Sequence, residues 1–331
     1  MKKLINDPKN VVNEMLIGLA AAHPDKLARV PDYNIIIRRE PKQGKVGLVS
    51  GGGSGHEPAH AGFVGVGMLD AAVCGNVFAS PSPDEILQGL TAADGGAGVL
   101  MIVKNYSGDV MNFDAARELA ELDDLKTETV IVDDDVAIAK DGQNAGRRGV
   151  AGTILVHKIA GALAERGASL VEVAEVARKV VRNVRTMGMA LTPCVLPEAG
   201  RARFSLGEGE MEIGIGIHGE PGVKKGAVAP AADIAGQLLE PILADLPLPA
   251  GSEVVLIVNG MGATPLMELY LMAGEILPRL AAKSLKVHRT LVGNFMTSLD
   301  MAGCSVTLLK LDDQLKSLLD DPTEAVAYPN Q

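Results

Sequence analysis

Short apolar runs, rich in β-branched residues, alternate along the chain with amphipathic stretches, which is typical of a mainly parallel α/β sheet. Three strands are predicted in the first half, at 45–50, 98–104 and 129–132. Two helices are predicted between them, at 84–93 and 113–122. Pro83-Asp84 and Asn112 are the signals for their starts. Each strand ends in a glycine- or Asp-rich loop, and ligands bind at that carboxyl edge in open α/β sheets.

The second half has a different pattern. A helix is predicted over 169–185, with Ser169 as N-cap and Glu172 completing a capping box. The strict alternation over 212–218 predicts a strand with Ile213, Ile215 and Ile217 on one face and His218 on the other. Further strands are predicted at 253–258 and 305–311, and a helix at 265–277. We therefore predict two α/β domains, over 1–185 and 186–331.

Composition and charge exclude several classes of protein. The 331 residues are enough for two domains, and aromatic residues make up only 3% with no Trp. Lys and Arg total 31 against 41 for Asp and Glu, and the one short basic cluster is Arg147-Arg148, so nucleic acid is not an expected partner. The three cysteines form no CxxC pair, and there is no signal peptide and no run of about 18 apolar residues. We expect a cytoplasmic protein without a membrane segment.

The first predicted strand runs into Gly51-Gly52-Gly53-Ser54-Gly55. Amides free of side-chain cover suit an anion or a small oxygen-rich ligand. The segment is neither a P-loop nor a dinucleotide fingerprint, because no Gly-Lys-Ser/Thr follows and GxGxxG is not matched. A tight strand-to-helix turn is the alternative interpretation.

The next five residues, His56-Glu57-Pro58-Ala59-His60, fit the HExxH pattern of zinc proteases. That motif requires both histidines on one face of an established helix, whereas here a glycine loop precedes it and Pro58 lies inside it. No third ligand follows at a familiar spacing. We therefore predict no metal site.

Two further positions carry candidate chemistry. Lys104 ends the second strand and Asp109 follows five residues later, so a cation and a carboxylate on one loop could hold a hydroxylated substrate and take its proton. An exposed local ion pair is the alternative. His218 ends the alternating strand, where a neutral imidazole acts as base or nucleophile, or simply caps a turn.

Taken together, these stretches resemble the dihydroxyacetone-binding K subunit of dihydroxyacetone kinases of the phosphotransferase-system-linked type. The segments that carry the resemblance are LVSGGGSGHEPAHAGFVG, GVLMIVKNYSGDVMNF, VDDDVA, AGRRGVAGT, EIGIGIHGEPG, GATPLMELY and GNFMTSLDMAG. They extend over nearly the whole chain in a consistent order.

The resemblance implies a role for each candidate residue. His218 matches the histidine whose Nε2 adds to the substrate carbonyl as a covalent hemiaminal. Lys104 and Asp109 match residues that hydrogen-bond the substrate hydroxyls. His56 and Asp109 are the candidates for acid/base work on the terminal hydroxyl, with the acid/base role assigned to His56 and a supporting or shared base role to Asp109. The residues that match the substrate-contacting loop are Gly53, Ser54, Gly55 and His56.

The resemblance also implies partners. No nucleotide site is found in this sequence, so ADP or ATP with Mg²⁺ is expected on a separate L subunit that delivers the phosphoryl group. That subunit is recharged from phosphoenolpyruvate through a multiphosphoryl M subunit, with exchange against ATP as the alternative. A homodimer is expected. Two other functions remain as alternatives, a non-catalytic dihydroxyacetone sensor or coactivator and, more distantly, a fatty-acid-binding protein.

Overall fold

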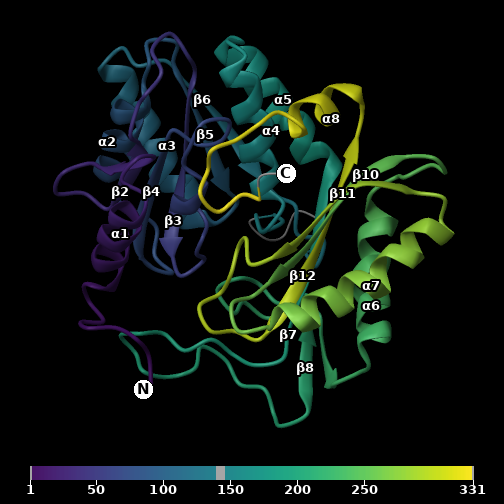
Figure 1. The fold of residues 1–331 in the computed structure, drawn as a ribbon. Coiled ribbons are helices and arrows are strands. Elements are labelled where there is room, and N and C mark those ends of the chain that lie inside the picture. Colours follow the sequence, from purple (N-terminus) through teal and green to yellow (C-terminus); the bar gives the residue numbers. More distant parts are fainter. Residues whose placement is uncertain (1, 139–145, 330–331) are drawn as a thin grey trace.

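The computed structural model describes residues 2–138 and 146–329. In these residues the chain forms two six-stranded sheets, one in each half, with helices on both faces of the first sheet and on the outer face of the second (Figure 1). The α/β fold class predicted from the sequence is confirmed.

The first sheet contains four neighbouring parallel strands and two antiparallel strands at one edge. In spatial order its strands are β1 (Leu27–Arg29), β2 (Ile35–Arg38), β4 (Ala71–Val77), β3 (Gly47–Ser54), β5 (Val99–Lys104) and β6 (Thr127–Val132). The carboxyl ends of β3, β4 and β5 therefore meet at one edge of the sheet.

Helices cover both faces of the first sheet. They are α1 (Val11–Ala22), the 3₁₀ turn η1 (Ala61–Phe63), α2 (Pro83–Ala93), α3 (Ser107–Leu122), α4 (Thr153–Glu165) and α5 (Leu170–Asn183). Ile86 of α2 and Phe113 of α3 pack in one apolar cluster with Val49 of β3, on one face. Leu48 of β3 packs on the other face in a cluster with Leu155 of α4.

The second sheet is mostly antiparallel. Its spatial order is β11 (Lys286–Gly293), β10 (Glu253–Gly260), β12 (Gly303–Leu311), β7 (Val184–Ala190), β8 (Glu210–Ile213) and β9 (Lys224–Ala227). The helices of this half are α6 (Ala231–Asp245), α7 (Leu266–Ala282) and α8 (Asp313–Leu319). Helices α6 and α7 pack on its outer face, as Figure 1 shows.

One apolar core joins the two halves. Leu48 and Ile102 of the first sheet belong to the same buried cluster as Val255 and Leu309 of the second, with α4 and α5 between them. After α8 the chain returns to the first half, where the Ala327 amide donates to the Gly62 carbonyl over 2.9 Å. The division into domains at 185/186 stays a prediction, with β7 starting the second sheet at Val184.

Most predicted elements are confirmed, with differences at the ends. The start of α2 at Pro83 and the capping box of Ser169 and Glu172 on α5 are confirmed. The predicted start of the next helix at Asn112 is wrong, because α3 begins at Ser107 and Asp109 therefore lies in its first helical turn. The described part of the chain contains no helix that is long and apolar enough to cross a membrane.

Two strand predictions fail at glycines. Strand β3 continues through the predicted loop to Ser54, because Gly51, Gly52 and Gly53 pair with β4. The strand predicted over 212–218 ends at Ile213, since Gly214 adopts the left-handed φ of +79° that a strand does not contain. The predicted shared face of isoleucines is also wrong: Ile213, Ile215 and Ile217 are all buried, but each belongs to a different apolar cluster. The beginning of the AGRRG segment at Ala145 lies outside the described residues.

Candidate active site at the junction of the two halves

Two histidines from the two halves meet at the carboxyl edge of the first sheet. His56 follows β3 by two residues, and His218 lies in the turn after β8. Their Nε2 atoms are 3.0 Å apart although 162 positions separate them in the sequence. The tertiary fold therefore brings together two of the residues that sequence analysis proposed as chemically active.

His56 is fully buried, and both of its ring nitrogens have partners. Its Nδ1 is 2.8 Å from the carbonyl oxygen of Thr297, in the loop between β11 and β12. Burial is the largest cause that lowers the pKa of His56 well below its ordinary value, and the charges of Lys104 and His218 lower it further. His56 is therefore neutral when its surroundings stay closed to water.

His218 is held by Glu220, two residues further on. Its Nδ1 is 2.8 Å from Glu220 Oε1, and its backbone amide donates to Oε2 over 2.9 Å. Burial alone would raise the pKa of the Glu220 carboxyl, but the hydrogen bonds and charge of His218 outweigh it and hold that pKa at about 2. Glu220 is therefore ionised at neutral pH and acts as an acceptor only.

These contacts determine how many protons the two rings share. A carbonyl and an ionised carboxylate only accept hydrogen bonds, so both Nδ1 atoms carry hydrogen, one toward Thr297 and one toward Glu220. The contact between the Nε2 atoms requires a third hydrogen. Two neutral imidazoles carry only two such hydrogens, so this complete hydrogen-bond pattern needs one more proton than two neutral rings supply. Burial disfavours a charge on His56, whereas His218 lies beside the Glu220 carboxylate.

Lys104 and Asp109 are both buried, which contradicts the alternative of an exposed ion pair on a loop. Lys104 is the last residue of β5, and its Nζ has no hydrogen-bond partner among the described residues. Burial lowers its pKa, while the charges of Asp109, Glu220 and Glu57 act in the opposite direction. An ammonium group left without a partner in a buried site is a donor ready for a ligand oxygen.

Asp109, in the first turn of α3, accepts a short hydrogen bond from the Ser80 hydroxyl. Its Oδ2 would lie 2.9 Å from a Cβ at Gly52, so the carboxylate packs directly against the glycine segment. Asp109 of α3 and the glycines of β3 thus border the same small region.

The predicted glycine segment contributes space more than side chains. A Cβ at Gly53 would lie only 2.6 Å from the Ala79 amide nitrogen, so glycine is required there. The Ser54 hydroxyl donates to the Gly75 carbonyl over 2.7 Å, which uses it within the sheet. The Gly55 amide donates to Glu57 Oε1 over 3.0 Å. The roles of Gly53, Ser54 and Gly55 as substrate contacts stay predictions.

The HExxH pattern does not bring its two histidines to one point. His56 contacts His218, whereas His60 Nδ1 is 3.0 Å from Nε2 of His157, on α4. Within residues 2–138 and 146–329 there is no group of three or more His, Cys, Asp or Glu side chains arranged to hold a metal ion.

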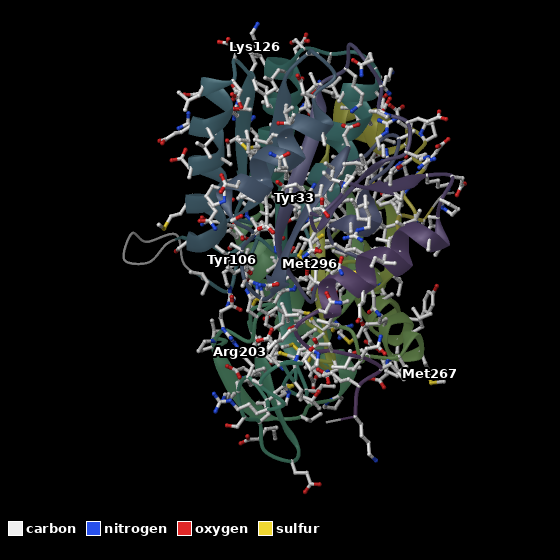
Figure 2. All side chains as sticks on the ribbon, turned by 90° about the vertical axis from the view of Figure 1, so that its left-hand side faces the viewer. Tyr33, Tyr106, Lys126, Arg203, Met267 and Met296 are labelled. Atoms are coloured by element: carbon white, nitrogen blue, oxygen red, sulfur yellow. The ribbon has the colours of Figure 1, made fainter. Side chains whose placement is uncertain are left out.

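Sequence analysis missed several residues of the site. They are Ser80, Glu220, Thr297 and two aromatic neighbours of the histidines, Phe78 and Tyr106. Glu220 had a local signal, a carboxylate two residues after a candidate nucleophile. The Thr297 carbonyl had none, because backbone atoms leave no trace in composition. Figure 2 shows Tyr106 at the level where the two halves meet.

The described residues of the third predicted loop, after β6, brace the fold. Asp134 accepts hydrogen bonds from the amides of Val150 and Gly152 at 2.8 Å each, and Asp135 pairs with Arg148.

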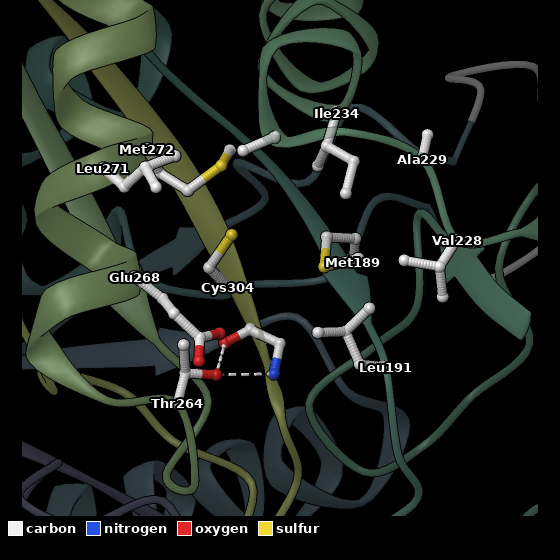
Figure 3. A pocket seen from close by; sticks show the side chains of 12 residues that line it. Met189, Leu191, Val228, Ala229, Ile234, Thr264, Glu268, Leu271, Met272 and Cys304 are labelled. Carbon is white, nitrogen blue, oxygen red and sulfur yellow. Dashed lines mark hydrogen bonds between the residues drawn. The ribbon is translucent and has the colours of Figure 1, made fainter. Parts of the chain in front are cut away.

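A separate apolar cavity of about 170 Å³ lies behind the second sheet, between it and helices α6 and α7 (Figure 3). Met189, Met272 and Cys304 contribute to its lining, with Glu268 as its charged residue. None of the predicted site residues lines it, so it is distinct from the histidine site.

Comparison with known families gives a match over almost the whole chain. The family described as the Dak1 domain matches residues 17–327. The PTS-dependent dihydroxyacetone kinase 1, dihydroxyacetone-binding subunit DhaK, of Listeria innocua is 54% identical over 329 residues, covering 99% of this chain and 100% of that protein.

Solved structures agree with this match. The dihydroxyacetone kinase from C. freundii in complex with AMP-PNP and Mg²⁺ has a TM-score of 0.91 and 37% identity, covering 99% of this chain and 61% of that one. The dihydroxyacetone kinase operon co-activator DhaQ has a TM-score of 0.90 and 38% identity, covering 95% and 97%. A fatty-acid-binding DegV family protein from Thermus thermophilus, at 13% identity, 81% and 100% coverage and a TM-score of 0.51, shares the fold alone.

Proposed function

The chain belongs to the Dak1 domain family, and from this premise we propose that it is the dihydroxyacetone-binding subunit of a phosphotransferase-system-linked dihydroxyacetone kinase. The observation that carries the proposal is the pair of Nε2 atoms 3.0 Å apart, backed by the Glu220 carboxylate on one side and the Thr297 carbonyl on the other. Such a pair both exposes a nucleophile and moves a proton.

The first step is covalent binding of dihydroxyacetone. The proton on Nε2 of His218 passes to Nε2 of His56, which leaves a lone pair on His218 to attack the substrate carbonyl carbon. The carbonyl π electrons move to oxygen, and His56 returns its proton there to form the hemiaminal hydroxyl. The substituted His218 ring keeps its Nδ1 hydrogen, and Glu220 balances its positive charge.

A covalent bond suits this substrate. Dihydroxyacetone offers only six heavy atoms, so contact area alone binds it weakly. Addition to a carbonyl also discriminates against glycerol, which has no carbonyl group to attack.

The second step is transfer of a phosphoryl group to a terminal hydroxyl. Lys104 donates to a substrate oxygen through its free Nζ, and Asp109 takes the hydroxyl proton as the oxygen attacks phosphorus. In the adduct His218 Nε2 is bonded to the substrate and His56 faces the new hemiaminal hydroxyl, so Asp109 is assigned as the base in this step.

The phosphoryl donor comes from partners. An L subunit with a bound adenine nucleotide and Mg²⁺ would deliver it, recharged from phosphoenolpyruvate through an M subunit. The proposal includes a cytoplasmic homodimer. The proposed link to the phosphotransferase system is based on the names of the relatives, since the Listeria innocua protein is called PTS-dependent and dihydroxyacetone-binding.

The test of the first step is intact mass spectrometry of the chain with dihydroxyacetone, under native conditions and after borohydride. We expect an adduct on the wild type and none on His218→Ala. An adduct that survives this substitution would contradict the assignment of the nucleophile.

The test of the second step separates binding from transfer. Asp109→Ala should keep the adduct and lose turnover about 1,000-fold in a kinase assay with added L subunit, because the base is removed while His218 is untouched. Unchanged turnover would refute this role of Asp109.

A non-catalytic sensor is the second candidate, favoured by the similarity to the co-activator DhaQ. Such a protein needs His218 but has no use for the phosphotransfer residues. Wild type that forms the adduct yet shows no turnover with the L subunit would establish the sensor.

A further inference from the structure

Phe78 has an unusual backbone conformation beside the histidine pair. It lies in the turn after β4 with φ of +56°, the left-handed region that a bulky aromatic residue rarely adopts. Its amide donates to the Ser54 carbonyl over 2.9 Å, which ties the turn to the end of β3. A conformation of this kind persists only where its surroundings hold it, and such residues cluster at functional sites.

The Phe78 ring touches both histidines. It stacks on His56 with centroids 5.1 Å apart and an interplanar angle of 16°, and it meets His218 edge-on at 5.1 Å and 86°. Tyr106 also meets His218 edge-on, at 4.6 Å and 87°. Of these two aromatic rings, Phe78 is the one that stacks on His56.

The neighbouring glycines leave the space that Phe78 occupies. A Cβ at Gly53 would lie 2.8 Å from the Phe78 Cα, and a Cβ at Gly55, where φ is +105°, would lie 2.8 Å from its ring. On its other side the ring packs with Leu299 against the buried cluster of Ile215 and Met261 in the second half. Phe78 therefore connects the turn of the first sheet with the loops of the second at the point where the histidines meet.

We propose that Phe78 is a positioning residue for the histidine pair. Its ring holds the imidazoles of His56 and His218 in the orientation that keeps their Nε2 atoms 3.0 Å apart, and it shields His56 from water. The consequence for catalysis, faster hemiaminal formation, rests on the proposed function. The shielding of His56 from water does not depend on the proposed function.

Removal of the ring has a predictable effect on titration. Water would reach His56, whose pKa is lowered chiefly by burial, and that pKa would rise toward 6.5. Lys104, His218 and His60 are the charged or titratable groups that act on His56, and they stay in place in such a variant. The rise therefore reports the loss of shielding.

The experiment uses two substitutions that remove the ring. Phe78→Gly accepts the left-handed backbone without strain, and Phe78→Leu keeps apolar volume in case the glycine variant is unstable. The chain already contains a leucine in this conformation, Leu299 with φ of +53°. Phe78→Tyr keeps the ring, and Tyr270→Phe is a conservative change at an exposed position on α7, outside the residues assigned to the site. These last two are the matched controls.

Two measurements are made on each full-length variant, the pH titration of the His56 ring by NMR and the rate of adduct formation. We expect the His56 titration to move up in Phe78→Gly and Phe78→Leu, and adduct formation to slow about 10- to 100-fold, as for misplacement of a reacting group. Both controls should stay within about twofold of the wild type.

An unchanged His56 titration in the two ring-deleting variants would overturn the proposal, as would a wild-type adduct rate. If the wild type forms no adduct, the proposed function is wrong, while the NMR titration still decides the role of Phe78.

Discussion

Two pairs of histidine rings lie in the first half of the molecule or at its border, and they differ in what surrounds them. His56 and His218 form the site pair, with nitrogens 3.0 Å apart and ring centroids 4.7 Å apart. His60 and His157 form the buried pair, with nitrogens 3.0 Å apart and centroids 5.2 Å apart. The contact between the rings is thus nearly the same in both pairs.

The two pairs differ at the ring nitrogens that point away from the other histidine of the pair. In the site pair these atoms face the Thr297 carbonyl and the Glu220 carboxylate. In the buried pair, His60 Nε2 and His157 Nδ1 have no hydrogen-bond partner among the described residues. Burial lowers the pKa of His157 to about 3, so this pair stays neutral. The site pair therefore ends on a carboxylate that can stabilise a charge on His218, whereas the buried pair ends on no polar group among the described residues.

The strongest way to break this comparison is to remove one histidine from each pair, using the two members of the same five-residue segment. His56→Asn should slow adduct formation about 100- to 1,000-fold, because the proton acceptor of the nucleophile is lost. His60→Asn should leave the rate within about threefold of the wild type. Rapid mixing with dihydroxyacetone, followed by intact-mass spectrometry at successive times, measures the rate of adduct formation in both variants. Equal losses of rate would mean that the two pairs are not functionally distinct.

A second substitution tests the carboxylate itself. Glu220→Gln keeps a hydrogen-bonding group beside His218 but removes the negative charge, so adduct formation should slow on the order of 100-fold, as when an orienting carboxylate is neutralised. Glu220→Asp is the matched control, since it restores the charge on a shorter side chain. A wild-type rate in Glu220→Gln would show that the extra proton is not needed.

The same substitution has a signature in stability. The Glu220 carboxyl has a folded-state pKa of about 2, below its ordinary 4.5, so its contribution is fully present above pH 4.5 and is lost as pH falls toward 2. Glu220→Gln should therefore lower the free energy of unfolding by about 1–3 kcal/mol at pH 7 and by less at pH 3.5. Urea denaturation at the two pH values measures the difference.

The smallest effect on activity is expected from the buried pair. His157→Leu should leave turnover within about threefold and lower the free energy of unfolding by about 1–3 kcal/mol, because the buried hydrogen bond to His60 is lost and His60 Nδ1 keeps only the longer contact to the Ser50 hydroxyl among the described residues. The folded-state pKa of His157, about 3, lies below 6.5, so the unfolded chain binds the proton more readily and stability falls as pH drops from 6.5 toward 3.

His157→Leu should therefore make the free energy of unfolding less dependent on pH in this window. Denaturation at pH 7.5 and pH 5 gives the slope, with Ile159→Val on the same helix as a control for buried substitutions without a titrating group. A slope identical to that of the wild type would mean that His157 titrates normally in the folded protein.

Much of the fold could be predicted because the evidence for it is local. The start of α2 at Pro83 and the capping box at Ser169 depend on residues within four positions, and the apolar runs of β5 and β10 lie within single strands. The errors in the strands came where glycine changed the pattern: at Gly51–Gly53, which continue a strand, and at Gly214, which ends one. Glycine is compatible with both outcomes, so its neighbours in space decide.

The sequence by itself determined the α/β class and most of the elements, and it predicted His56, Lys104, Asp109 and His218 as the candidate reactive groups. The tertiary structure alone decided how they are used. His56 and His60 come from one segment, yet they pair with rings from opposite halves of the molecule, and only one pair ends on a carboxylate. The reason is physical: protonation depends on burial and on partners a few ångströms away in space, and sequence distance carries neither.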